Sequence, residues 1–201
     1  MAKRKSTAPE NDKSANPKDF WATPEVAVLP LIQYLLPGTS FIEPCAGDGA
    51  LRDALVARGF PCARAIDIEP RGPGIDKCDA LDVDIVGATV VITNPPYSED
   101  LVVPLINHWI RSGEPDEEIE VWLLIPLDWI ANLWFAPFAP HVRKIVPIGR
   151  VKWIADSPSS GYENYAWVWF ERGETSFIEP RLRKDKQARL DRKRAEERLL
   201  G

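Results

Sequence analysis

The chain has 201 residues, a hydrophobic content of 45% and a formal net charge of −5, which is typical of one ordinary globular domain. No apolar stretch is long enough to span a bilayer, and no apolar signal region follows the basic N-terminal residues, so we expect a cytoplasmic protein without a membrane partner. Cys45, Cys62 and Cys78 lack the paired spacing of metal ligands, so we expect reduced, partly buried thiols and no metal site.

Charge divides the chain into three parts. Residues 1–19 are basic and rich in Ser, Pro and Asn, which predicts a disordered tail. Residues 181–201 hold nine basic and four acidic side chains, which predicts a charged basic tail or helix. The folded domain over residues 20–180 keeps only 11 of the 25 basic side chains and 23 of the 30 acidic ones. The tails are therefore either solvated ends or nonspecific contacts for nucleic-acid phosphates.

The predicted elements follow from apolar spacing and from the positions of Pro and Gly. Thr23 and Pro24 predict a helix start, with Thr23 as the cap, and that helix contains Pro30 and stops before Pro37. The further elements are strands over 39–44, 63–68, 88–93, 121–125, 144–148 and 165–170, helices over 51–58, 99–111 and 129–135, and an acidic loop over 114–120. This alternation predicts an α/β sheet with helices on both faces.

The loop from Glu43 to Gly49 follows a predicted strand and opens a helix, which is where doubly wound sheets bind nucleotides. Gly47 and Gly49 allow close backbone approach, although Arg52 stands in place of the third glycine of a dinucleotide fingerprint. Asp67 ends the next strand and is placed to accept hydrogen bonds from ribose hydroxyls. A carboxylate at position 43 would repel a pyrophosphate but suits a cationic ligand.

The tetrapeptide Asn94-Pro95-Pro96-Tyr97 closes a run of β-branched residues. Pro95 keeps Asn94 out of the helical region, and neither proline has a backbone N–H. The turn therefore offers the Asn94 carboxamide and the Pro95 carbonyl as acceptors, with the ring of Tyr97 alongside. Two acceptors and a ring suit a planar –NH2 substrate, because they hold its two hydrogens and let the nitrogen lone pair attack an electrophile.

Together with the segments 20–24, 41–51, 65–69 and 78–80, this turn resembles the ordered motifs of the gamma-type DNA adenine-N6 methyltransferases, particularly their short phage-type members. The resemblance covers roughly residues 20–170. It implies a class I S-adenosylmethionine methyltransferase fold, which is Rossmann-like, and S-adenosylmethionine as cofactor. It further implies methyl transfer to the exocyclic amino group of adenine in DNA, with the target base flipped out of the duplex.

The resemblance also implies roles for individual residues. Glu43 would hold the cationic amino-acid end of the cofactor, Asp79 would accept from its adenine, and Trp153 would hold the target base opposite Tyr97. The implied catalytic residues are Asn94, Pro95, Pro96 and Tyr97. The implied cofactor-binding residues are Trp21, Thr23, Glu43, Pro44, Cys45, Gly47, Gly49, Asp67, Ile68, Asp79, Ala80 and Asn94. The implied substrate-binding residues are Tyr97, Arg150, Lys152, Trp153, Ser159 and Gly161.

Several alternatives remain open at the level of sequence. Trp21 and Thr23 could form a hydrophobic staple and a helix cap, Asp79 could be a solvent-facing acid, and Trp153 could be a core residue. An Asn-Pro-Pro-Tyr turn also suits methyltransferases that act on cytosine amino groups, ribosomal RNA guanine or protein glutamine. A catalytically idle nucleic-acid-binding module and a nicotinamide dehydrogenase are two further classes.

Overall fold

The computed structural model describes residues 20–83, 90–111, 119–154 and 161–172; both predicted tails and Ser159 lie outside these residues. The strands are β1 (Phe41–Glu43), β2 (Cys62–Asp67), β3 (Asp76–Lys77), β4 (Val90–Thr93), β5 (Glu120–Pro126), β6 (Val142–Arg150) and β7 (Asn164–Phe170). The helices are α1 (Glu25–Ile32), α2 (Ala50–Val56) and α3 (Glu99–Arg111). The described residues also form the short 3₁₀ turns η1 (Ala80–Asp82), η2 (Leu127–Ala131), η3 (Leu133–Phe135) and η4 (Ala139–His141).

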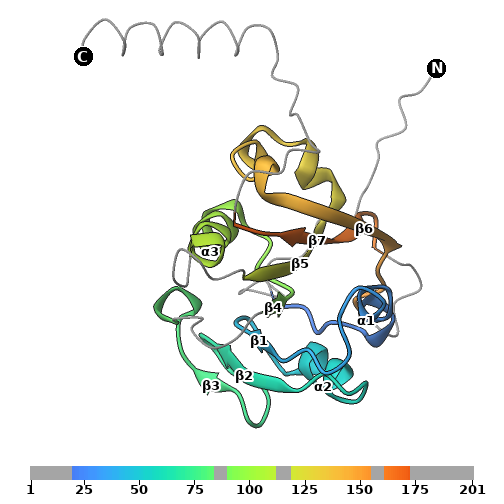
Figure 1. Ribbon diagram of the computed structural model, residues 1–201, viewed down its shortest axis with the longest axis vertical. Coiled ribbons are helices and arrows are strands. Elements are labelled where there is room, and N and C mark those ends of the chain that lie inside the picture. The colour runs from blue at the N-terminus through green and yellow to red at the C-terminus, as the bar shows by residue number, and fades with distance from the viewer. Residues whose placement is uncertain (1–19, 84–89, 112–118, 155–160, 173–201) are drawn as a thin grey trace, which may run out of the picture.

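The described strands form one sheet in the order β3-β2-β1-β4-β5-β7-β6 (Figure 1). The strands from β3 to β5 are parallel, whereas β7 runs antiparallel to both β5 and β6. The strand order reverses between β1 and β4, and ligands of open α/β sheets bind outside the carboxyl ends of the strands at such a point. The insertion of β7 between β5 and β6 departs from the 3-2-1-4-5-6 order of dinucleotide-binding sheets.

Both faces of the sheet are covered, as predicted. Helices α1 and α2 lie on one face of the sheet and α3 lies on the other (Figure 1). Alternate strand residues point to opposite faces, so Val90 and Ile92 pack with α1 and α2, whereas Val91 packs with α3. Trp167 is fully buried, and its indole N–H donates to the backbone carbonyl of Ala27 at 2.7 Å, which ties β7 to α1. The α/β class is therefore confirmed.

The start and the end of helix α1 differ from those predicted from the sequence. Its N-cap is Pro24, no side chain caps it, and it ends at Ile32 rather than just before Pro37. Instead of capping the helix, the Thr23 hydroxyl accepts a hydrogen bond from Asn94, which lies 71 residues away in the sequence. The predicted cap at Thr23 is therefore wrong.

Other differences are small. The segment predicted as a helix over 129–135 consists of the 3₁₀ turns η2 and η3, which are separated by Asn132 in an extended conformation. The two-residue strand β3 was not predicted, because so short an element leaves no periodic pattern. The acidic loop predicted over 114–120 falls mostly outside the described residues, and Glu120 begins β5. Helix α3 has the predicted bounds.

In the described part of the chain, no helix has the length and apolar character needed to cross a membrane.

Candidate active site

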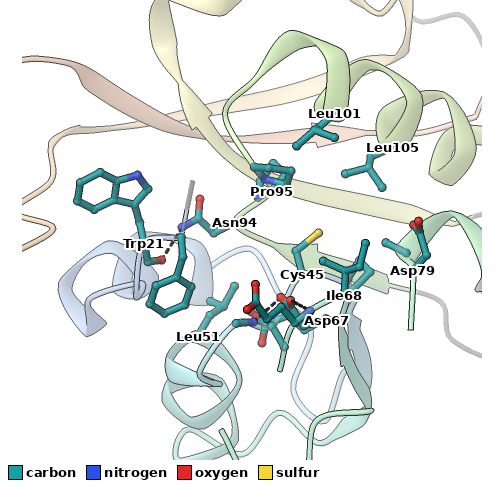
Figure 2. Close-up of a pocket in the computed structure, with 18 of the residues that line it drawn as sticks. Trp21, Cys45, Leu51, Asp67, Ile68, Asp79, Asn94, Pro95, Leu101 and Leu105 are labelled. Carbon is teal, nitrogen blue, oxygen red and sulfur yellow. Dashed lines mark hydrogen bonds between the residues drawn. The ribbon is translucent and has the colours of Figure 1, made fainter. Parts of the chain in front are cut away.

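A cavity of about 260 Å³ lies at the carboxyl ends of β1, β2 and β4. Figure 2 shows Asp79 at one side of it, Trp21 and Asn94 at the other, and Asp67 between them. Thirteen residues predicted from the sequence line this cavity: Trp21, Thr23, Glu43, Pro44, Cys45, Gly47, Asp67, Ile68, Asp79, Ala80, Asn94, Pro95 and Pro96. The structure therefore brings together the predicted cofactor motifs and the Asn-Pro-Pro turn.

Six described residues with predicted roles are not part of the cavity lining: Gly49, Tyr97, Arg150, Lys152, Trp153 and Gly161. Ser159 lies outside the described residues. Tyr97 and Trp153 belong to an aromatic cluster that adjoins the cavity, whereas Arg150 and Lys152 are exposed at and just beyond the end of β6. Their substrate roles remain predictions.

The cavity is also lined by residues to which the sequence analysis gave no individual role: Phe20, Ala46, Asp48, Leu51, Glu69, Arg71, Leu81, Asp100, Leu101, Pro104 and Leu105. Leu101 and Leu105 stand four residues apart near the start of α3, so they share one helix face directly after the Asn-Pro-Pro turn. That spacing was visible in the sequence. Ile68, Leu81 and Leu101 are large apolar side chains that remain exposed, and they give the cavity an apolar wall.

Glu43 is the most unusual charged group of the site. It ends β1, its side chain is 1% exposed, and its Oε2 atom has no hydrogen-bond partner among the described residues. Burial raises the pKa of this carboxyl well above its ordinary value, while the backbone N–H and the charge of Arg52 act in the opposite direction. A buried carboxylate oxygen without a hydrogen-bond partner is costly, so this position favours a ligand that brings positive charge.

The loop from Glu43 to Gly49, called the glycine loop below, has a backbone conformation that depends on its two glycines. Gly47 and Gly49 have φ angles of 54° and 89°, in the left-handed region. A Cβ at Gly47 would lie 2.5 Å from the ring of Phe20, and one at Gly49 would lie 2.6 Å from the guanidinium of Arg52. The side chain of Arg52 thus fills the space beside the second glycine.

Asp67 anchors this loop from the end of β2. Its Oδ2 accepts from the backbone N–H of Gly47 at 2.7 Å, and its Oδ1 accepts from the N–H of Glu69 at 2.7 Å. A carboxylate has about four lone-pair sites, so it can still accept from a further donor. The sequence analysis did not anticipate this structural role.

Asp79 lies at the opposite end of the cavity. It caps η1, and its Oδ1 accepts from the N–H of Leu81 at 2.9 Å. Its side chain is exposed, as expected for a solvent-facing acid, and it also lines the cavity, as a contact with a cofactor would require. Ala80, the next residue, is buried beneath it.

Cys45 lines the cavity, and burial makes its thiol a poor nucleophile. All three cysteines are free and partly exposed. Burial, together with the negative charge of Asp67, raises the pKa of Cys45 far above its ordinary value, so this thiol stays protonated. A covalent mechanism through Cys45 is therefore disfavoured.

The Asn-Pro-Pro turn begins directly after β4. The Nδ2 atom of Asn94 donates to the Thr23 hydroxyl at 3.1 Å and to the Trp21 carbonyl at 3.4 Å, the second bond being drawn in Figure 2. The Oδ1 atom of Asn94 accepts from the hydroxyl of Tyr97 at 2.6 Å. The acceptor predicted for a substrate amino group is therefore in contact with Tyr97 in this state.

Tyr97 also belongs to an aromatic cluster. Its ring centroid lies 5.7 Å from that of Trp129, 6.1 Å from that of Trp153 and 5.6 Å from that of Tyr165. Trp153 lies 5.0 Å from Tyr165 and 6.4 Å from Trp21. The structure thus places Trp153 edge-on beside Tyr97, and its role in holding a target base stays a prediction.

The sequence matches no protein-family model and no curated protein sequence. The fold, in contrast, is similar to solved structures. A Listeria monocytogenes protein assigned as a class I S-adenosylmethionine-dependent methyltransferase has a TM-score of 0.52 at 14% identity, over 83% of this chain and 64% of that one. A Vibrio vulnificus protein assigned as the modification subunit of a type I restriction enzyme has a TM-score of 0.52 at 13% identity, over 82% of this chain and 47% of that one.

A Pyrococcus horikoshii protein assigned as an RNA methyltransferase has a TM-score of 0.56 at 12% identity, over 79% of this chain and 88% of that one. The chain thus spans less than two thirds of the Listeria and Vibrio proteins. These likenesses establish the fold: a mixed α/β sheet of the class I S-adenosylmethionine-dependent methyltransferase type, which is Rossmann-like.

Proposed function

We propose that this protein binds S-adenosylmethionine in the cavity and transfers its methyl group to the exocyclic amino group of adenine in DNA. The observation that carries this proposal is the position of Asn94 and Pro95. They line the same cavity as Glu43, the buried carboxyl whose Oε2 atom has no hydrogen-bond partner in the described part of the chain. An acceptor turn for an amino group and a site for a cation therefore share one cavity.

The charge of the cavity favours this cofactor over a nicotinamide dinucleotide. Its lining has one basic residue, Arg71, and six acidic ones: Glu43, Asp48, Asp67, Glu69, Asp79 and Asp100. S-adenosylmethionine carries a sulfonium, an ammonium and a carboxylate, so its net charge is positive, whereas a dinucleotide carries an anionic pyrophosphate. Opposite unit charges 4 Å apart attract by about 4 kcal/mol near a protein surface.

The residues that would hold the cofactor are those for which the sequence resemblance implies this role and which also line the cavity. Glu43 would accept from the ammonium, Asp67 from ribose hydroxyls and Asp79 from the adenine amino group. The exposed side chains of Ile68 and Leu101 offer apolar surface to a flat ring. When bound, S-adenosylmethionine supplies an electrophilic methyl group on a sulfonium.

The remaining chemistry belongs to the turn. The Asn94 Oδ1 atom and the Pro95 carbonyl would accept from the substrate amino group and stabilise the positive charge that grows on its nitrogen. Tyr97 would stack on a flipped base, which returns about 1–3 kcal/mol against a flipping cost of a few kcal/mol. Because the Tyr97 hydroxyl now contacts the Asn94 oxygen, it must move or share this acceptor when the substrate arrives.

Calorimetric titration tests the cofactor assignment. The protein should bind S-adenosylmethionine, and the affinity should fall as salt rises, because the cavity attracts a cation. Replacement of Asp67 by Asn should weaken binding by about tenfold, the scale of one hydrogen bond to a charged group. Asp76→Asn is the matched control, since Asp76 is exposed on β3 outside the cavity. Binding of NADH in place of S-adenosylmethionine would contradict the assignment.

The substrate is tested by sequencing that detects modified bases, on DNA from cells that express the protein. We expect N6-methyladenine in a defined or loose sequence context. Purified DNA, ribosomal RNA and, for the protein-glutamine alternative, a release factor should also be incubated with the protein and radiolabelled S-adenosylmethionine. Methyl transfer to RNA, to cytosine or to glutamine instead of DNA adenine would keep the reaction type and replace the substrate.

Deletion of residues 181–201 should lower the affinity for DNA and flatten its salt dependence while cofactor binding stays unchanged. Each lost phosphate contact should reduce the slope of log K against log salt by about 0.9. Fluorescence anisotropy with a labelled duplex measures both quantities. A full-length variant with the nine basic residues changed to Gln is the control for chain length. A salt slope that does not change would assign no phosphate contact to this segment.

A further inference from the structure

The segment from Phe20 to Thr23 connects the glycine loop with the Asn-Pro-Pro turn. The ring of Phe20 lies against Gly47, and the guanidinium of Arg71 lies 4.1 Å from the centroid of that ring. Three residues later, the Thr23 hydroxyl accepts from Asn94. Both ends of this short segment therefore contact a functional part of the cavity.

The contacts of Asn94 define which way its carboxamide faces. The Trp21 carbonyl can only accept, so the amide nitrogen rather than the amide oxygen must face it. The Thr23 hydroxyl accepts from the same nitrogen, and Thr23 is only 6% exposed, so water competes little for this contact. The amide oxygen is consequently directed to the side occupied by the Tyr97 hydroxyl.

We propose that Thr23 is a positioning residue that orients the Asn94 carboxamide, so that its oxygen faces the amino group to be methylated. This inference rests on the proposed function. It gives Thr23 a task other than the cofactor contact that the sequence resemblance implies. The physical reason is that a catalytic dipole stabilises developing charge only when it is already aligned, and its misalignment costs rate rather than ground-state binding.

The test compares Thr23→Val, which removes the acceptor at nearly constant volume, with Thr23→Ser, which keeps the hydroxyl. Thr23→Val should lower kcat by about tenfold and leave the Kd for S-adenosylmethionine within about threefold, because it disturbs alignment rather than binding. Thr23→Ser should restore kcat. Thr39→Val is the matched control, since the exposed Thr39 hydroxyl bonds only to the Leu36 carbonyl in the described structure.

A double-mutant cycle with Asn94→Ala completes the test. If Thr23 acts through Asn94, adding Thr23→Val to Asn94→Ala should cause no further loss of kcat. A raised Kd for S-adenosylmethionine with unchanged kcat would overturn the assignment, as would additive losses in the double variant. Absence of methyl transfer by the wild type on every substrate offered would overturn the proposed function and this assignment with it. Transfer by the wild type at a rate that Thr23→Val leaves unchanged would overturn the assignment alone.

Discussion

Replacement of Asn94 by Ala should lower turnover by about 100-fold or more, the scale seen when one dipole aimed at transition-state charge is removed. Affinity for S-adenosylmethionine should stay within a few-fold, because the side chain is only partly buried and the core below it is unchanged. Single-turnover methyl transfer to unmethylated DNA measures the chemical step, and calorimetry measures cofactor binding. Turnover at the wild-type rate would make this turn structural and remove the basis of the proposed reaction.

Tyr97 provides the contrast to Asn94. Tyr97→Phe keeps the ring and removes the hydroxyl that contacts the Asn94 oxygen, so turnover should stay close to that of the wild type. Tyr97→Ala also removes the stacking surface, worth about 1–3 kcal/mol per base. A substrate that is single-stranded or mismatched at the target should partly rescue Tyr97→Ala, since less flipping energy is needed. It should not rescue Asn94→Ala, whose lost contact belongs to methyl transfer itself.

Replacement of Glu43 by Gln should weaken S-adenosylmethionine binding by about 100-fold. The variant loses a charged hydrogen-bond acceptor for the ammonium, and such contacts are worth about 1.5–3 kcal/mol. The unliganded protein should gain stability at neutral pH, because the variant no longer buries a carboxylate oxygen that lacks a partner within residues 20–83, 90–111, 119–154 and 161–172. Calorimetry and thermal unfolding without ligand separate the two effects. The control is Glu25→Gln, which removes an exposed carboxylate on α1, and equal binding by both variants would contradict the role of Glu43.

The same carboxyl predicts two opposite pH dependences. Its folded-state pKa is raised above 4.5, so between these two values the unliganded native protein binds more protons than the unfolded chain. The stability contributed by Glu43 is therefore present at low pH and is lost as the pH rises through the folded pKa. Cation binding favours the ionised form, so cofactor affinity should rise with pH across this window. Both slopes should become flatter in Glu43→Gln.

The sequence alone was enough to predict that the residues at the ends of three strands line one cavity. Glu43, Asp67 and Asn94 each end or follow a strand predicted from local apolar patterns, and the carboxyl ends of parallel strands share one edge. The alternation of apolar residues likewise predicted two covered faces. These features depend on local periodicity and on the fixed geometry of Pro, so they can be read without knowing the tertiary contacts.

Only the tertiary structure decided how the side chains meet. Thr23 reads as a helix cap in the sequence, yet it bonds to Asn94 because the fold brings two segments 71 residues apart to the same cavity. The same holds for Phe20 against Gly47, and for β7 between β5 and β6. Local patterns specify which face of an element is buried, but they do not specify which distant element covers it. That information lies in long-range packing, which joined separate motifs into one site.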